Sequence, residues 1–127
     1  MNLFKKLKNS KILLIDDDEW IRDSMSLFFE EENCKLLTFE TAEEGLNELN
    51  KHSFDIIISD YKLPGMNGLE FFKTIQKTCK NSIRILITAY GTEEVFLQAR
   101  QLGVHDIIKK PFKTENIEAS LSLFIKD

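Results

Sequence analysis

The feature that most constrains the fold of this chain is an alternation of short aliphatic runs with longer amphipathic segments. The aliphatic runs lie at residues 11–15, 35–39, 55–59, 83–88 and 105–108. Most of them are apolar without an alternation of period two, which is typical of strands covered on both faces, as parallel strands are. The sequence therefore predicts five parallel strands with helices between them.

The amphipathic segments carry recognisable helix boundaries. Thr41 and Glu44 have the spacing of a capping box. Thr92 and Thr114 can each cap a later helix, and Gly103 is suited to follow the end of one. Repeated strand–helix–strand units imply right-handed crossovers and helices on both faces of the sheet. The predicted fold class is therefore α/β, a doubly wound parallel sheet of five strands with about five helices.

The first amphipathic segment shows how the two faces of such a helix are assigned. Ile21, Met25 and Phe29 recur at the spacing of one helical face, which is expected to lie against the sheet. Arg22 and Asp23 fall outside this apolar stripe. We therefore expect both charged side chains to face water.

Length and charge limit the classes of function. The chain has 127 residues, enough for one domain with its own core, and a formal net charge of −4. This charge has the wrong sign for electrostatic capture of nucleic acid. No apolar run approaches the roughly 18 residues of a membrane span, and the first residues lack the features of a signal peptide. We expect residues 1–10 to form a tail and residues 11–127 to form the domain.

The two cysteines indicate a reducing compartment. Cys34 and Cys79 lie far apart and outside any CxxC spacing, so neither a zinc site nor a redox motif is predicted. Reduced thiols of this kind are typical of cytosolic proteins. We therefore expect a cytoplasmic location.

Polar side chains collect where the predicted strands end. They are Asp16, Asp17, Asp18, Ser59, Asp60, Thr88, Lys109 and Lys110. Ligands of open α/β sheets bind at this edge, where the carboxyl ends of parallel strands meet. Adjacent carboxylates repel one another unless a cation such as Mg²⁺ neutralises them, and Mg²⁺ also favours an incoming phosphate. An aspartate can act as the nucleophile, while lysine and threonine contact phosphoryl oxygens. The set predicts phosphoryl chemistry.

Four stretches at these strand ends resemble a known family. They are KILLIDDDE, DIIISDYKLPGMNGLEFF, ILITAY and HDIIKKPF. In order and spacing they resemble the signature blocks of bacterial two-component response-regulator receiver domains of the single-domain, chemotaxis-regulator type. The resemblance spans residues 11–124 and implies a flavodoxin-like fold. It also implies a signalling phosphoacceptor, activated by phosphorylation, that catalyses only its own phosphorylation and dephosphorylation.

The resemblance implies a role for each acidic residue. Asp60 would be the phosphoacceptor. Asp16 and Asp17 would hold Mg²⁺ together with Asp60, and the backbone carbonyl of Lys62 would complete the metal ligands. Asp18 falls on the next position, which is more variable in the family.

The same resemblance assigns the residues that contact the phosphoryl group and transmit the signal. Thr88 would be the switch hydroxyl and Lys110 the phosphate-contacting lysine, joined to Pro111 by a cis bond. The family commonly has Tyr or Phe where this chain has Ile107, so we expect an aliphatic repacking instead of an aromatic swing. The signal should leave through the fourth helix, the fifth strand and the fifth helix.

The partners follow from the family as a class. A sensor histidine kinase or a phosphotransfer protein would donate the phosphoryl group, and a downstream protein would read the result. The chain is expected to be a monomer or a phosphorylation-dependent dimer. It is expected either to stand alone or to be a receiver cut from a longer regulator.

Two other functions use part of the same chemistry. A phosphohydrolase of the haloacid-dehalogenase type would use Asp16 and Asp18 as its DxD pair. That fold needs a further acidic pair after a late strand, which the sequence does not supply after Lys110, and it leaves DYKLPGMNG unexplained. An interaction module that has lost phosphorylation is the other alternative. Lys62 and Tyr90 flank the predicted path of a hydrolytic water, and we expect them to slow the loss of the phosphoryl group.

Overall fold

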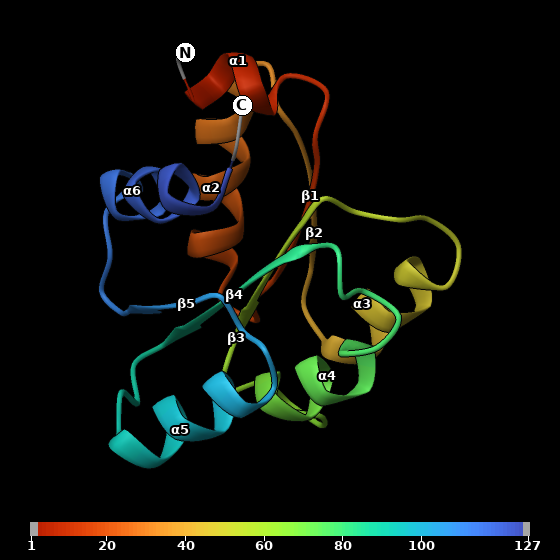
Figure 1. Cartoon of the computed structure of the whole chain (residues 1–127). Helices are drawn as coiled ribbons and strands as arrows, with labels where there is room; N and C mark the ends of the chain where they lie inside the picture. Colours follow the sequence, from red (N-terminus) through yellow and green to blue (C-terminus); the bar gives the residue numbers. More distant parts are fainter. Residues whose placement is uncertain (1–2, 126–127) are drawn as a thin grey trace.

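The computed structural model describes residues 3–125 of the chain (Figure 1). Its strands are β1 (Lys11–Ile15), β2 (Lys35–Phe39), β3 (Ile56–Asp60), β4 (Ile83–Thr88) and β5 (Asp106–Lys109). Its helices are α1 (Leu3–Leu7), α2 (Glu19–Glu31), α3 (Ala42–Leu49), α4 (Gly68–Ile75), α5 (Glu93–Gln101) and α6 (Thr114–Phe124). The strands form one parallel sheet in the order β2-β1-β3-β4-β5. The predicted doubly wound sheet of five parallel strands is confirmed.

Helices cover both faces of this sheet, and successive strand residues point to opposite faces. Helices α2 and α6 lie on one face, and α3, α4 and α5 lie on the other (Figure 1). In β1, Ile12 and Leu14 belong to the core shared with α2 and α6, whereas Leu13 and Ile15 belong to the core shared with the other three helices. All four side chains are fully buried. Burial on both faces explains why the aliphatic runs show no period of two.

The structure contains a sixth helix that the sequence did not predict. Part of the expected tail over residues 1–10 forms α1, which packs against α6. Leu7 is fully buried in the core, and the Phe4 ring meets the edge of the Phe28 ring at a centroid distance of 5.7 Å. The spacing of Leu3, Phe4 and Leu7 places them on one side of the helix. Residues 1–2 of the expected tail and 126–127 of the expected domain lie outside the described residues.

Most predicted helix boundaries are confirmed. Thr41 forms the capping box of α3 with Glu44, and Thr92 caps α5 by accepting the Val95 N–H at 3.2 Å. Gly103 follows α5 with a φ of 78°, in the left-handed region that favours glycine.

The predicted cap of the last helix is wrong. Thr114 is the first residue of α6, and Lys113 is the capping position. The Asn116 side chain accepts the Lys113 N–H at 2.7 Å, and this bond sets the start of the helix one residue earlier than predicted.

Strands β3 and β5 each lie one residue later than predicted, so Asp60 is the last residue of β3. None of the helices in residues 3–125 is long and apolar enough to cross a membrane.

Candidate functional site

Three carboxylates converge at the carboxyl edge of the sheet. Asp16 follows β1 and Asp60 ends β3, and these two strands are neighbours. Asp16, Asp17 and Asp60 each offer a carboxylate oxygen, and these oxygens all lie within 4.8 Å of one another. Asp16 and Asp60 are buried, whereas Asp17 is exposed. The structure therefore brings together the three acidic side chains that the sequence predicted as metal ligands.

The third aspartate of the DDD run is not part of this cluster. Asp18 is the N-cap residue of α2, and its carboxylate accepts the Trp20 N–H at 2.9 Å. Its own N–H donates to Asp16 Oδ1 at 2.9 Å. Asp18 therefore starts a helix and orients Asp16, which does not support a haloacid-dehalogenase reaction through an Asp16–Asp18 pair.

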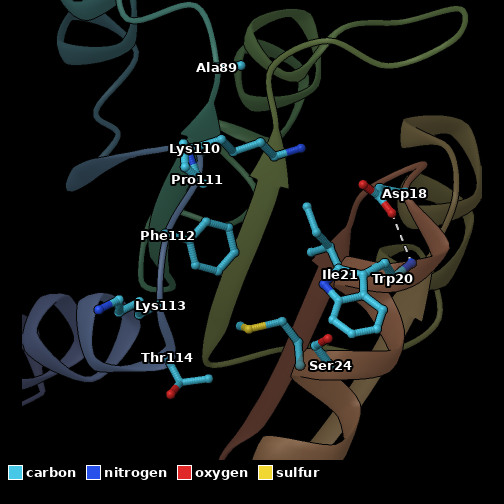
Figure 2. Close-up of a pocket in the computed structure, with 11 residues that line it drawn as sticks. Asp18, Trp20, Ile21, Ser24, Ala89, Lys110, Pro111, Phe112, Lys113 and Thr114 are labelled. Carbon is cyan, nitrogen blue, oxygen red and sulfur yellow. Dashed lines mark hydrogen bonds between the residues drawn. The ribbon is translucent and has the colours of Figure 1, made fainter.

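Lys110 is the cation of the site. Its ammonium donates to Asp60 Oδ2 at 2.8 Å and lies 3.1 Å from Asp16 Oδ2. The backbone N–H of Lys110 donates to the Thr88 carbonyl at 2.8 Å, which continues the pairing of β5 with β4. Figure 2 shows the side chain extending from the end of β5 toward the residues that follow β1. The predicted cis bond between Lys110 and Pro111 is present.

Burial makes this cluster electrostatically unbalanced. It raises the pKa of Asp60 from 3.8 to about 6, with the neighbouring Asp16 carboxylate adding to the rise and Lys110 opposing it. The pKa of Asp16 is also raised, mainly by burial. Burial works against the charged form of Lys110, but its bonds to the two carboxylates outweigh this effect, and the pKa of Lys110 is raised. Lys110 therefore pairs with two of the three carboxylates, those of Asp16 and Asp60.

Asp16 Oδ2 shows that a further cation fits here. This oxygen is buried and has no hydrogen-bond partner among residues 3–125, although Lys110 lies within ion-pair distance. A buried carboxylate oxygen without a hydrogen bond is costly unless another group binds it. Mg²⁺ is a hard ion that prefers such oxygens, and Asp17 and Asp60 add two more at short range. The donor set therefore fits a magnesium ion.

Thr88 and Ile107, the residues predicted to form a switch, lie on the neighbouring strands β4 and β5. Thr88 is the last residue of β4 and is fully buried, and its hydroxyl oxygen accepts the Tyr90 N–H at 2.8 Å. Ile107 pairs with Leu86 across the β4–β5 ladder and is half-buried against the core that includes Val95. The sheet therefore links the end of β4 to the surface that α5 and β5 form.

Two cavities open beside the cluster. One, of about 440 Å³, is lined by Asp17, Asp60 and Lys110 together with Lys62 and Tyr90. The other, of about 570 Å³, is drawn in Figure 2 and lies between the start of α2 and the β5–α6 connection. Its wall is mostly apolar and includes Trp20, a residue that is 78% exposed. Lys110 and Ala89 line both cavities, so the apolar groove adjoins the acidic site.

Sequence reasoning missed one residue of the site. Arg22, expected to face water, turns inward and donates from Nη1 to the Asp16 carbonyl oxygen at 2.9 Å. Its side chain is only 14% exposed. Helical side chains tilt toward the N-terminus of their helix, which lets Arg22 reach back past the first turn of α2. The position of an arginine one turn after an acidic strand end is the signal that could have revealed it.

Comparisons with known proteins point to one family. The family model of the response regulator receiver domain matches residues 12–122. The transcriptional regulatory protein FlgR of Helicobacter pylori is 34% identical over 112 residues, covering 87% of this chain and 28% of that protein. The sporulation initiation phosphotransferase F of Bacillus subtilis is 28% identical over 119 residues, covering 94% of this chain and 96% of that protein.

The likeness extends to solved structures. The chemotaxis response regulator CheY4 of Vibrio cholerae matches with a TM-score of 0.83 at 28% identity, covering 90% of this chain and 97% of that chain. This chain spans 23–28% of the length of the first three curated relatives, all of them transcriptional regulatory proteins. The comparisons therefore concern one domain of those regulators and nearly all of the smaller proteins.

Proposed function

This chain belongs to the family of response regulator receiver domains, which are phosphorylation-activated signalling receivers, and on this premise we propose that Asp60 is its phosphoacceptor. The observation that carries the proposal is the 2.8 Å contact between the Lys110 ammonium and Asp60 Oδ2, beside the Asp16 and Asp17 carboxylates. These four side chains supply a nucleophile, a cation for phosphoryl oxygens and a place for a metal. The protein would catalyse only its own phosphorylation and dephosphorylation.

The residues would divide the reaction between them. Asp16, Asp17 and Asp60 would hold Mg²⁺ through carboxylate oxygens, with the Lys62 backbone carbonyl as a further ligand. When bound, Mg²⁺ supplies positive charge that offsets the carboxylates and the phosphoryl group. An Asp60 oxygen forms a bond to phosphorus while the bond from phosphorus to the donor breaks. Lys110, kept protonated by its raised pKa, donates to the phosphoryl oxygens of the product.

The response to phosphorylation would begin at Thr88. In the unphosphorylated structure its hydroxyl oxygen is bound by the Tyr90 N–H, two residues further along. A phosphoryl oxygen on Asp60 offers an acceptor for the Thr88 O–H, and a shift of Thr88 toward it would open space behind the side chain. Ile107 would repack into that space, and the surface formed by α5, β5 and α6 would change. A downstream protein would read this surface.

The phosphodonor would approach over the apolar groove. The groove is next to Lys110 and carries the exposed Trp20, and tryptophan is enriched among the residues that dominate protein interfaces. A sensor histidine kinase or a phosphotransfer protein that packs on the groove would bring its phosphoryl group to the edge where Asp60 lies. Either donor fits this proposal, because both present the same phosphohistidine chemistry.

Incubation with acetyl phosphate and Mg²⁺, followed by mass spectrometry, tests the proposal. We expect one added phosphoryl group on Asp60, sensitive to hydroxylamine as acyl phosphates are. Removal of Mg²⁺ with EDTA and the Asp60→Asn substitution should each abolish it. Asp18→Asn is the matched control, because asparagine also caps helices and Asp18 is outside the carboxylate cluster. A phosphoryl group found on Asp16 or Asp18 of the wild type would overturn the assignment.

A further inference from the structure

Arg22 joins the connection that follows β1 to the connection that follows β2. Its Nη1 donates to the Asp16 carbonyl oxygen at 2.9 Å, and its Nη2 lies 3.3 Å from Glu40 Oε1. Glu40 follows β2 directly, and the residue before it, Phe39, accepts the Asp16 N–H at 3.0 Å. The backbone around Asp16 and the end of β2 are therefore tied together twice, once by the sheet and once through Arg22.

These bonds leave one polar atom of Asp16 without a hydrogen bond. The N–H donates to Phe39, the carbonyl oxygen accepts from Arg22, and Oδ1 accepts from the Asp18 N–H. Only Oδ2 has no hydrogen-bond partner among residues 3–125, and it is the atom that lies within ion-pair distance of Lys110. Asp16 is thus held at three points, with its fourth polar atom directed toward the cluster.

We propose that Arg22 is a positioning residue, which fixes the backbone of Asp16 so that Oδ2 is presented to a divalent cation. This inference rests on the proposed function, since it concerns how well the site binds Mg²⁺. Arg22 would act through the hydrogen bond to the Asp16 carbonyl, and Glu40 would hold the other end of the guanidinium. Partners that orient metal ligands in this way typically affect metal affinity strongly.

The sign of the effect separates this role from a simple electrostatic one. Arg22 is a cation near the predicted Mg²⁺ site, so by charge alone its removal should strengthen the binding of Mg²⁺. Loss of positioning should do the opposite, because Asp16 Oδ2 would no longer be held in place. A purely structural role would lower the free energy of unfolding and leave the affinity for Mg²⁺ unchanged.

The test compares variants of the full chain by calorimetric titration with MgCl₂. Arg22→Met keeps the length of the side chain and removes its donors, and we expect the Kd for Mg²⁺ to rise about tenfold. Arg22→Lys keeps the charge and one donor group, and its Kd for Mg²⁺ should lie between those of the wild type and Arg22→Met. Lys35→Met is the matched control, since it removes the charge of an exposed lysine at the opposite end of β2. Its Kd should be unchanged.

A second measurement works without any metal. Hydrogen exchange of the Asp18 N–H, which donates to Asp16 Oδ1, should be faster in Arg22→Met than in the wild type in EDTA. The inference is overturned if Arg22→Met leaves the Kd unchanged or lowers it, or if Asp18 exchange is unaffected. Should the wild type neither bind Mg²⁺ nor form an acyl phosphate on Asp60, the proposed function fails instead. Wild-type phosphorylation with an unaltered Arg22→Met affinity would reject the positioning role alone.

Discussion

The Lys62 ammonium donates to the Tyr90 hydroxyl at 3.3 Å and lies 5.1 Å from the centroid of the same ring. Lys62 follows β3 and Tyr90 follows β4, so the contact joins the two connections that border Asp60. The Tyr61 ring also meets the Tyr90 ring edge-on, at a centroid distance of 6.4 Å. Tyr90 is therefore in contact with both Tyr61 and Lys62. Two side chains that line the same cavity as Asp60 are therefore in contact with each other.

This contact should prolong the life of the aspartyl phosphate. Neither a lysine nor a tyrosine is suited to orient the water that attacks phosphorus, and we expect the pair to obstruct its approach. We expect Lys62→Asn combined with Tyr90→Glu to lose the phosphoryl group at least about tenfold faster, because both new groups can orient water. Tyr90→Phe, which keeps the ring, is the control and should change the rate little. Decay of phosphorylated protein, followed by mass spectrometry, would reject the idea if the double variant decayed at the wild-type rate or more slowly.

The raised pKa of Asp60 predicts a pH-dependent cost to stability. Between pH 3.8 and about 6, Asp60 is protonated to a greater extent in the folded protein than in the unfolded chain. This group therefore favours folding at low pH. That contribution is lost as the pH rises through 6. Asp60→Asn should therefore be more stable than the wild type by about 2 kcal/mol at pH 7.5, with the difference shrinking at pH 5.

Urea unfolding in EDTA at several pH values measures this difference. Asp18→Asn serves as the control, because it changes the same functional group at a position outside the cluster. A difference between Asp60→Asn and the wild type that stays constant from pH 5 to 7.5 would contradict the raised pKa.

The exposed Trp20 should matter for a protein donor and not for a small one. Truncation of a tryptophan at an interface commonly costs 2 kcal/mol or more, so Trp20→Ala should slow phosphotransfer from a subsaturating histidine phosphotransfer protein at least about tenfold. Phosphorylation by acetyl phosphate should be unchanged. Leu97→Ala is the control, because it also removes an exposed apolar side chain, but on α5 and not on α2. Equal slowing with both kinds of donor would place Trp20 in the chemistry instead of the docking.

Phosphorylation should be felt at Ile107. Methyl resonances of Ile107 and of Val95, which share one core cluster, should shift when Asp60 is phosphorylated, because we expect the end of β4, whose Leu86 pairs with Ile107, to move with Thr88. Ile12, in the cluster on the other face of the sheet near the start of β1, is an internal reference and should shift least. Shifts confined to α2, with none near Ile107, would refute the α5–β5–α6 route.

Two helical glycines should respond differently to alanine. A Cβ on Gly68 would clash with the Asp60 carbonyl oxygen, and this backbone atom cannot give way without moving the site. Gly68→Ala should therefore cost about 1–3 kcal/mol and slow phosphorylation. A Cβ on Gly45 would lie 2.5 Å from Ile15 Cδ1, the flexible end of a side chain, and the gain in helix propensity of about 1 kcal/mol offsets part of the strain. Equal urea unfolding midpoints for both variants would show that the Asp60 backbone can yield.

The sheet and the acidic cluster were predictable because each depends on a strong local pattern. Continuous aliphatic runs can be satisfied only by burial on both faces, and parallel strands then bring Asp16 and Asp60 to one edge. Arg22 was not predictable in the same way. A charged residue outside an apolar stripe normally faces water, and only the three-dimensional position of the Asp16 carbonyl oxygen draws it inward.

The other differences have similar causes. Helix α1 has a single turn of apolar residues, too few for a periodic signal, and it forms because Leu7 can be buried against the rest of the fold. At the start of α6, Thr114 and Asn116 are both good capping side chains, and their competition is decided by the Asn116 bond to Lys113. Local sequence does not rank such alternatives.

The position of Trp20 makes docking on the groove measurable by tryptophan fluorescence. It is the single tryptophan of the chain, and it stands in the wall that also includes Lys110. Indole emission would therefore arise from one place, a few residues from the carboxylates and open to solvent. A docked protein would displace that solvent, so the colour and intensity of the emission would record docking without any attached dye. The same residue that we expect to contact the donor would thus report the rates at which the donor associates and dissociates.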